Sequence, residues 1–72
     1  MVMMPLTMAD PGVDQLIKKV GGREDTRKFL ENLGFVAGEP VKVISKISGN
    51  VIIDVKGTRI ALDRNLASKI HI

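Results

Sequence analysis

The carboxylates and the single histidine are the residues of this sequence that could bind a metal ion or move protons. They are dispersed along the chain, and the main candidates are Glu24, Asp25, Glu39, Asp54, Asp63 and His71. A metal site needs several converging ligands, and no His-x-x-x-His or Asp-x-Asp-x-Asp spacing is present. Helix capping explains Glu24 and Asp25, and an exposed strand position explains His71. We therefore predict no cofactor and no metal site, with weak divalent metal binding left open.

Catalytic residue patterns are equally sparse. The chain has no cysteine, and a Ser-His-Asp triad would have to use His71, which precedes the final residue. No segment resembles the turn that carries a nucleophilic serine. Gly21-Gly22 lacks the Lys and Ser/Thr of a phosphate-binding loop. We therefore predict that the protein is not an enzyme.

A basic cluster offers a different chemistry, contact with phosphates. It consists of Lys18, Lys19, Arg23, Arg27 and Lys28. Proteins that bind single strands usually add aromatic side chains on which bases stack, and this chain has two Phe and no Trp or Tyr. A solvated basic face is the simpler interpretation, and we expect no nucleic-acid partner. A small basic RNA-binding barrel remains the least favoured alternative.

Length and composition indicate one small folded domain covering residues 1–72, with residues 1–5 expected to be disordered. The chain has 72 residues, 44% hydrophobic and 26% charged, and a formal charge of +3. Met1 to Pro5 lacks the basic start and apolar run of a secretory signal. No stretch is long and apolar enough to cross a membrane. We expect a cytoplasmic protein without direct membrane insertion.

The Glu24-Asp25 pair and most of the basic cluster lie at or near one predicted helix, from Thr26 to Leu33. Asp25 is its expected N-cap. The apolar spacing fits one face of a helix with about 3.6 residues per turn, and it contains Phe29, Leu30 and Leu33. Gly34 follows, where a left-handed residue can end the helix. Packing must hold so short a helix, so we expect Leu33→Ala to cost roughly 2–5 kcal/mol.

Short strands are predicted on both sides of the helix. Before it, Leu6 and Met8 can enter the core, and Val13 to Val20 reads as a strand with a bend, in which Leu16, Ile17 and Val20 are buried. After it, Val41 to Ile47 forms a strand whose alternation Ile44 interrupts. Gly49-Asn50 and Gly57-Thr58 are the expected turns of the following hairpins.

The end of the chain completes the predicted sheet. Val51, Ile53 and Val55 share one face of a strand, and Ile60 and Leu62 share the buried face of the next. Asp63 is expected to cap a single helical or 3-10 turn, and Lys69 to Ile72 is a short last strand. About five short strands with tight turns favour a small closed barrel, because closure removes exposed edges.

The order and spacing of four segments resemble the FeoA family over about residues 6 to 72. The segments are Arg27 to Gly38, which reads Arg-Lys-Phe-Leu-Glu-Asn-Leu-Gly-Phe-Val-Ala-Gly; Val41-Lys-Val43; Gly49 to Leu62; and Ala67 to Ile72. Two departures are Ala37, where the family often has proline, and Ile72, where it has valine. The resemblance implies a mainly β, SH3-like barrel of about five strands, one two-turn α-helix and a short 3-10 turn before the last strand.

The resemblance also implies a function in bacterial ferrous iron uptake. FeoA-like proteins are accessory factors of FeoB, a GTP-dependent membrane permease, so the implied partner is the cytosolic part of a FeoB-type transporter. The similarity extends to the C-terminal domain of iron-dependent repressors, which gives the main alternative, a regulatory domain that senses a transition metal.

The residues expected to touch the partner lie on the helix and its exit: Arg27, Lys28, Glu31, Val36 and Glu39. Solubility alone could also explain this set. Phe29, Leu30, Leu33, Gly34 and Gly38 are expected to be structural. A homodimer that pairs through Ile70-His71-Ile72 is left open.

Overall fold

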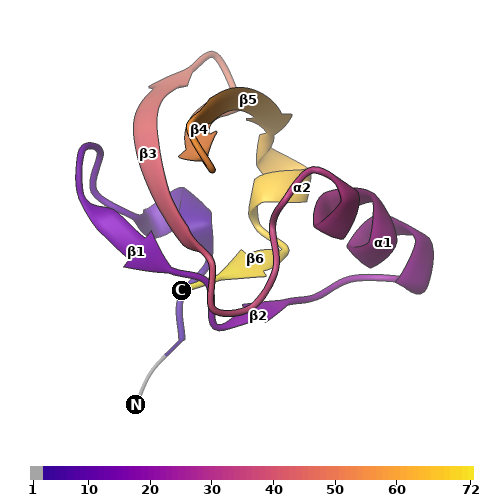
Figure 1. The fold of residues 1–72 in the computed structure, drawn as a ribbon. Helices are drawn as coiled ribbons and strands as arrows, with labels where there is room; N and C mark the ends of the chain where they lie inside the picture. The colour runs from indigo at the N-terminus through magenta and orange to yellow at the C-terminus, as the bar shows by residue number, and fades with distance from the viewer. Residues whose placement is uncertain (1–2) are drawn as a thin grey trace.

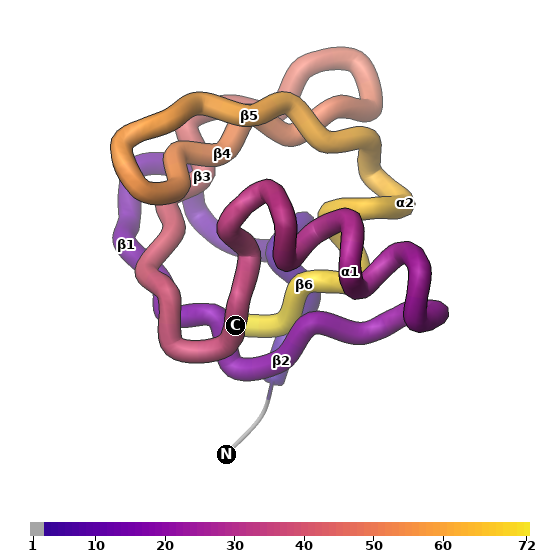
Figure 2. The backbone as a smooth tube through the Cα atoms, turned by 45° about the vertical axis from the view of Figure 1, so that its right-hand side comes forward, coloured from indigo at the N-terminus to yellow at the C-terminus, as the bar shows by residue number. Residues whose placement is uncertain are grey.

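A short antiparallel barrel carries one helix beside it (Figures 1 and 2). The computed structural model describes residues 3–72. In chain order the elements are a 3-10 turn η1 (Leu6–Met8), β1 (Asp14–Leu16), β2 (Lys19–Val20), α1 (Glu24–Asn32), β3 (Pro40–Ile47), β4 (Asn50–Val55), β5 (Thr58–Asp63), α2 (Arg64–Ala67) and β6 (Ile70–His71). The mainly β class with one longer helix is confirmed.

The strands form two antiparallel sheets that together enclose the core. The larger has the order β1-β3-β4-β5, and the smaller pairs β2 with β6. In Figure 1 the larger sheet curves strongly and β2 with β6 crosses its lower end. The inward face of β4 is formed by Val51, Ile53 and Val55, all buried as predicted. The largest fully buried side chain is Phe35.

Six strands appear because the predicted first strand changes partner midway. The N–H of Ile17 donates to the carbonyl of Glu39 at 3.0 Å, whereas the N–H of Lys18 donates to that of His71 at 2.8 Å. The predicted bend is therefore a switch between sheets. The prediction that Leu16 is buried is wrong: it faces outward opposite Pro40 and is 58% exposed, because Ile17 takes the core position.

The N-terminal segment is paired with the end of the chain. The N–H of Met4 donates to the carbonyl of Ile72 at 3.0 Å, the reverse bond is 2.8 Å, and Pro5 lies opposite His71. Met4 and Pro5 are thus bonded to the last strand, while positions 1 and 2 lie outside the described residues, and the expected disorder of residues 1–5 stays a prediction. These bonds and those to β2 lie along both edges of β6 within a single chain.

The turn η1 covers one end of the barrel. It buries Leu6 as predicted, and Ala9 directly after it is also buried. Met8 was expected to enter the core but is 66% exposed. A 3-10 turn places successive side chains about a third of a turn apart. Leu6 therefore points inward while Met8 points into solvent.

An inserted residue in β3 reverses which residues face inward. The register shifts between Val43 and Ser45, which confirms that Ile44 interrupts the alternation. Val43 lies inward opposite Ile53, yet Lys46 lies opposite the buried Val51. Directly opposed residues share a face of the sheet. The insertion therefore places Lys46 on the same face of the sheet as Val51, at the end of β3 next to the hairpin.

The outer face of the larger sheet carries one row of alternating charges. In register, Asp14 of β1 lies opposite Lys42, Lys42 opposite Asp54, and Asp54 opposite Arg59 of β5. The Lys42 Nζ and an Asp14 carboxylate oxygen are 3.8 Å apart. Opposite charges on facing strands favour this register over slipped ones.

Both hairpin turns lie one residue earlier than predicted. The turns are Ser48-Gly49 and Lys56-Gly57, and φ is positive at all four residues, from 46° to 84°. Positive φ at both turn positions is the mark of a type I′ turn, whose twist matches that of the strands. The glycines were read as the first turn residue, but each is the second, so Asn50 and Thr58 begin strands.

The helix α1 begins two residues earlier than predicted and ends one residue earlier, at Asn32, with Leu33 as its C-cap. Arg23 is the N-cap and makes no side-chain capping bond, so Asp25 is not the cap; its carboxylate accepts from the N–H of Thr26 at 2.9 Å within the first turn. At the other end, Gly34 has φ 107°.

The predicted cap of α2 is confirmed, since Asp63 accepts from the N–H of Leu66 at 2.7 Å, although α2 is a single α-helical turn instead of a 3-10 turn.

A hydrogen-bonded cap at Gly34 joins α1 to the core. The N–H of Phe35 donates to the carbonyl of Leu30, and the N–H of Gly34 to that of Glu31, each at 3.0 Å. This pair of bonds is the Schellman motif, in which the left-handed position favours glycine and the two residues flanking the cap pack together. Leu30 and Phe35 are both fully buried.

Phe29 does not belong to this core. Phe29 is 50% exposed, so the prediction that it packs on the core face of the helix is wrong. Adjacent helical residues point about 100° apart, and the barrel covers the side of α1 that carries Leu30. Thr26 and Leu33, which are partly buried, share the face of Leu30 instead.

We predict that Leu30→Ala lowers the free energy of unfolding by about 2–5 kcal/mol, because it leaves a cavity beside Phe35. The matched change Phe29→Ala should cost less than about 1 kcal/mol, because most of that ring already contacts water. Urea unfolding followed by circular dichroism measures both. Equal losses for the two variants would contradict the assignment of Leu30 to the core and Phe29 to the surface.

We also predict that Ser48→Asn stabilises the protein by about 0.5 kcal/mol. A serine at positive φ is disfavoured, and Asn-Gly is the preferred pair for this turn. Thermal unfolding would show a raised midpoint. Ser48→Ala is the control and should give no increase, because alanine gains nothing at positive φ.

Candidate functional site

The predicted partner-binding residues form a surface over α1 and the turn that follows it, here called the α1 surface: Arg27, Lys28, Glu31, Val36 and Glu39. The three helical members are exposed, as expected. Arg27 and Glu31 are one turn apart and therefore neighbours on the helix. Lys28 instead pairs with Glu24, with 3.2 Å between Nζ and a carboxylate oxygen.

The two turn members are less accessible than the helical ones. Val36 is partly buried, and the Glu39 side chain is only 21% exposed. A Glu39 carboxylate oxygen lies 4.0 Å from the Lys56 Nζ, so this residue also joins the turn to the β4–β5 hairpin. The structure therefore groups Arg27, Lys28 and Glu31 on α1 and sets Val36 and Glu39 apart as half-covered residues of the turn.

Gly38 positions the turn relative to the first strands. Its φ is 89°, and its N–H donates to the carbonyl of Ile17 at 2.7 Å. The next residue, Glu39, accepts the N–H of Ile17. These two bonds fix the turn against the point where the chain passes from β1 to β2. The expected structural role of Gly38 thus has a clear geometric basis.

Phe29 is the surface residue that sequence reasoning misplaced. Its half-exposed ring stands on α1 beside Lys28, among mostly charged neighbours. A large aromatic side chain in such a position is typical of protein–protein contacts, where aromatics are enriched. The sequence carried no signal for this position, since apolar residues at i, i+1 and i+4 span about 100° of a helix and fit one face, so only the contact with the barrel decides which of them is covered.

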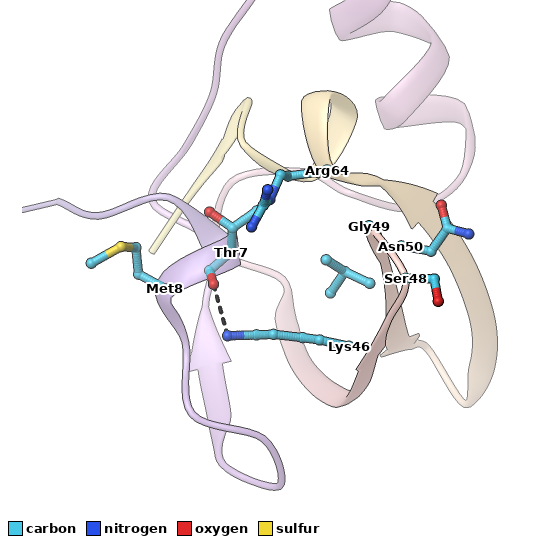
Figure 3. A pocket seen from close by; sticks show the side chains of 8 residues that line it. Thr7, Met8, Lys46, Ser48, Gly49, Asn50 and Arg64 are labelled. Atoms are coloured by element: carbon cyan, nitrogen blue, oxygen red, sulfur yellow. Dashed lines mark hydrogen bonds between the residues drawn. The ribbon is translucent and has the colours of Figure 1, made fainter.

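Three of the hollows on the described part of the protein lie near candidate residues or charged side chains. One, of about 300 Å³, lies over the outer sheet beside Glu39, Lys42 and Asp54. A second, of about 420 Å³, is an open depression formed by Glu24, Asp25 and Lys28. The third, of about 240 Å³, lies where η1, the β3–β4 hairpin and the start of α2 meet, and is here called the barrel mouth (Figure 3). Its lining residues include Thr7, Met8, Lys46, Asn50, Val51 and Arg64.

The candidate metal ligands do not converge. Within residues 3–72 no three His, Cys, Asp or Glu side chains come close enough together to hold a metal ion. Asp63 caps α2, and Glu24 pairs with Lys28. The candidates thus lie apart from one another, as their spacing in the sequence predicted. Among the same residues, no helix is long and apolar enough to cross a membrane.

Comparison with known proteins identifies a family that covers nearly the whole chain. The sequence model of the FeoA domain matches residues 4–72. A Methanocaldococcus jannaschii protein named "Putative Fe(2+) transport protein A" is 37% identical over 70 residues, which are 97% of this chain and 85% of that protein.

Solved structures agree with this family. The crystal structure of an iron uptake regulatory protein, FeoA, superposes with a TM-score of 0.87 at 27% identity, over 99% of this chain and 95% of that one. Stenotrophomonas maltophilia FeoA in complex with zinc, described as an SH3 domain protein, gives 0.81 at 25% identity, over 93% and 86%.

The fold also occurs in metal-dependent repressors. A manganese-dependent transcriptional repressor superposes with a TM-score of 0.87 at 11% identity, over 97% of this chain but 40% of the repressor. At this identity only the shared SH3-like fold is shown. The FeoA family model covers nearly the whole chain, and the Methanocaldococcus jannaschii relative is 37% identical. This protein belongs to the FeoA family of ferrous iron transport proteins.

Proposed function

We propose that this protein is a non-enzymatic accessory factor of ferrous iron uptake that binds, from the cytoplasm, the cytosolic part of a FeoB-type GTP-dependent permease. The observation that carries the proposal is the half-exposed Phe29 on α1, the helix that also bears the exposed Arg27, Lys28 and Glu31. Because the chain belongs to the FeoA family, a component of a ferrous iron transport system is the expected partner for such a contact.

The energetics favour a contact centred on Phe29. Aromatic anchors at the centre of an interface carry much of its binding energy, while surrounding charged residues steer association and set specificity. Asp25 and Asn32 are the exposed helix neighbours of Phe29, whereas Arg27 and Glu31, two residues away from it, project from the other side of α1 and could contact only a partner that covers more of the helix. The rigid Schellman cap holds α1 in place, so little conformational entropy would be lost on binding.

A metal-sensing function is the second candidate. It is supported by the zinc complex of the Stenotrophomonas FeoA and by the fold shared with a manganese-dependent repressor. No group of three His, Cys, Asp or Glu side chains that could hold a metal ion occurs within residues 3–72, which weighs against this candidate. Titration calorimetry with manganese or cobalt tests it, and no heat at near-millimolar metal would remove it.

We predict that Phe29→Ala weakens binding to the purified cytosolic domain of the transporter at least about tenfold, the loss typical of an interface anchor. Biolayer interferometry with the full chain measures the affinity. Ile47→Ala is the matched control, since this apolar residue on β3 is 58% exposed and lies outside the α1 surface. Equal affinities for the two variants would exclude Phe29 as the anchor.

We further predict that Arg27→Glu combined with Lys28→Glu slows association, most strongly at low salt, because exposed charges act mainly on encounter rates. The double variant Lys18→Glu, Lys19→Glu makes the same change of charge on exposed residues elsewhere and should have a smaller effect. Unchanged binding after the change on α1 removes this surface from the proposal. A larger effect of the Lys18 and Lys19 changes would indicate that the transporter contacts the region of β2 instead of α1.

A further inference from the structure

The barrel mouth is lined by Lys46, an exposed residue of β3. The insertion at Ile44 places Lys46 opposite the buried Val51, and both line the cavity. The Lys46 Nζ donates to the carbonyl oxygen of Thr7, 39 residues away in sequence, at 2.7 Å. This bond fixes the ammonium group at the mouth and uses one of its three protons. Two donors remain for another partner.

A second cation faces the same cavity. Arg64 is the first residue of α2, and its backbone N–H donates to the carbonyl of Gly49 at 2.9 Å, which ties α2 to the β3–β4 hairpin. In Figure 3 the side chains of Arg64 and Lys46 extend from separate elements toward Thr7. Within residues 3–72, the carboxylates that form ion pairs do so with Lys28, Lys42 and Lys56, and none pairs with Lys46 or Arg64.

The charge balance of this cavity differs from that of the other two hollows. Carboxylates line both of those: Asp14, Glu39 and Asp54 in the one over the sheet, and Glu24 and Asp25 in the depression on α1. No carboxylate lines the barrel mouth, where the remaining polar side chains are those of Thr7, Ser48 and Asn50. Two cations with neutral hydroxyl and amide groups match a small oxyanion, because guanidinium and ammonium groups bind phosphate through charge-assisted hydrogen bonds.

We propose that the barrel mouth binds a phosphate group, held between Lys46 and Arg64. At about 240 Å³ the cavity suits inorganic phosphate or a small phosphomonoester better than a drug-sized molecule. The site shares no residue with the α1 surface. It is thus independent of the proposed contact with the transporter.

The test is an NMR titration of the isotope-labelled full chain with sodium phosphate, with sodium chloride at matched ionic strength as the reference. The expected result is saturable amide shifts at Thr7, Lys46, Gly49 and Arg64 that chloride does not reproduce. A second arm uses glycerol phosphate: tighter binding than inorganic phosphate identifies a phosphomonoester, and equal binding identifies phosphate itself. Shifts that follow ionic strength alone, or none up to tens of millimolar, overturn the proposal.

Two variants assign the site. Arg64→Gln keeps a good helix former in α2, removes the guanidinium, and should weaken phosphate binding by about tenfold. Lys28→Gln removes an exposed charge from α1 and should leave binding unchanged. Lys46→Gln removes the second cation; because it also removes the bond to Thr7, its fold is checked from the amide spectrum. Equal affinity for Arg64→Gln and the unchanged chain overturns the proposal.

Discussion

Closure of the barrel by its shortest strands is the constraint on which the structure depends. β2 and β6 contribute two residues each, yet Ile70 and Ile72 are buried with the larger sheet's core. An isolated pair of this length is unstable in water. It persists because Lys18 bonds to His71 and Met4 to Ile72, so β6 is held along both edges. Removing either β2 or the segment at Met4 would leave an unpaired edge of β6 and expose the core to water.

The position of α1 follows from that closure. Ile17, where the chain passes from one sheet to the other, bonds to both Gly38 and Glu39 and so holds the turn that leads out of the helix. At the start of the same turn, the cap at Gly34 joins Leu30 to Phe35 in the core. A nine-residue helix would not persist alone in water. The exposed face of α1 is therefore a rigid surface, which a binding partner would not have to order.

The sequence predicted what depends on local pattern and missed what depends on distant partners. The alternation of Val51, Ile53 and Val55, the cap at Asp63 and the stop at Gly34 all follow from neighbouring residues, and each was predictable. Leu16 and Phe29 were misplaced because the choice between them and Ile17 or Leu30 is made by the barrel. Likewise, the contact of Lys46 with Thr7 joins segments that no spacing rule connects. The α1 surface was proposed from family resemblance, but its aromatic centre came from the structure.

The insertion in β3 affects how this sequence could diverge. Substituting Ile44 changes one partly buried side chain, whereas deleting it would remove only the bulge and leave Ser45 and Lys46 opposite Ile52 and Val51. Lys46 would keep its position in the barrel mouth, but β3 would lose the local bend and the extra twist that a bulge adds. In an alignment of relatives, a gap at this position would therefore mark proteins whose third strand is straighter and whose barrel closes with a different curvature.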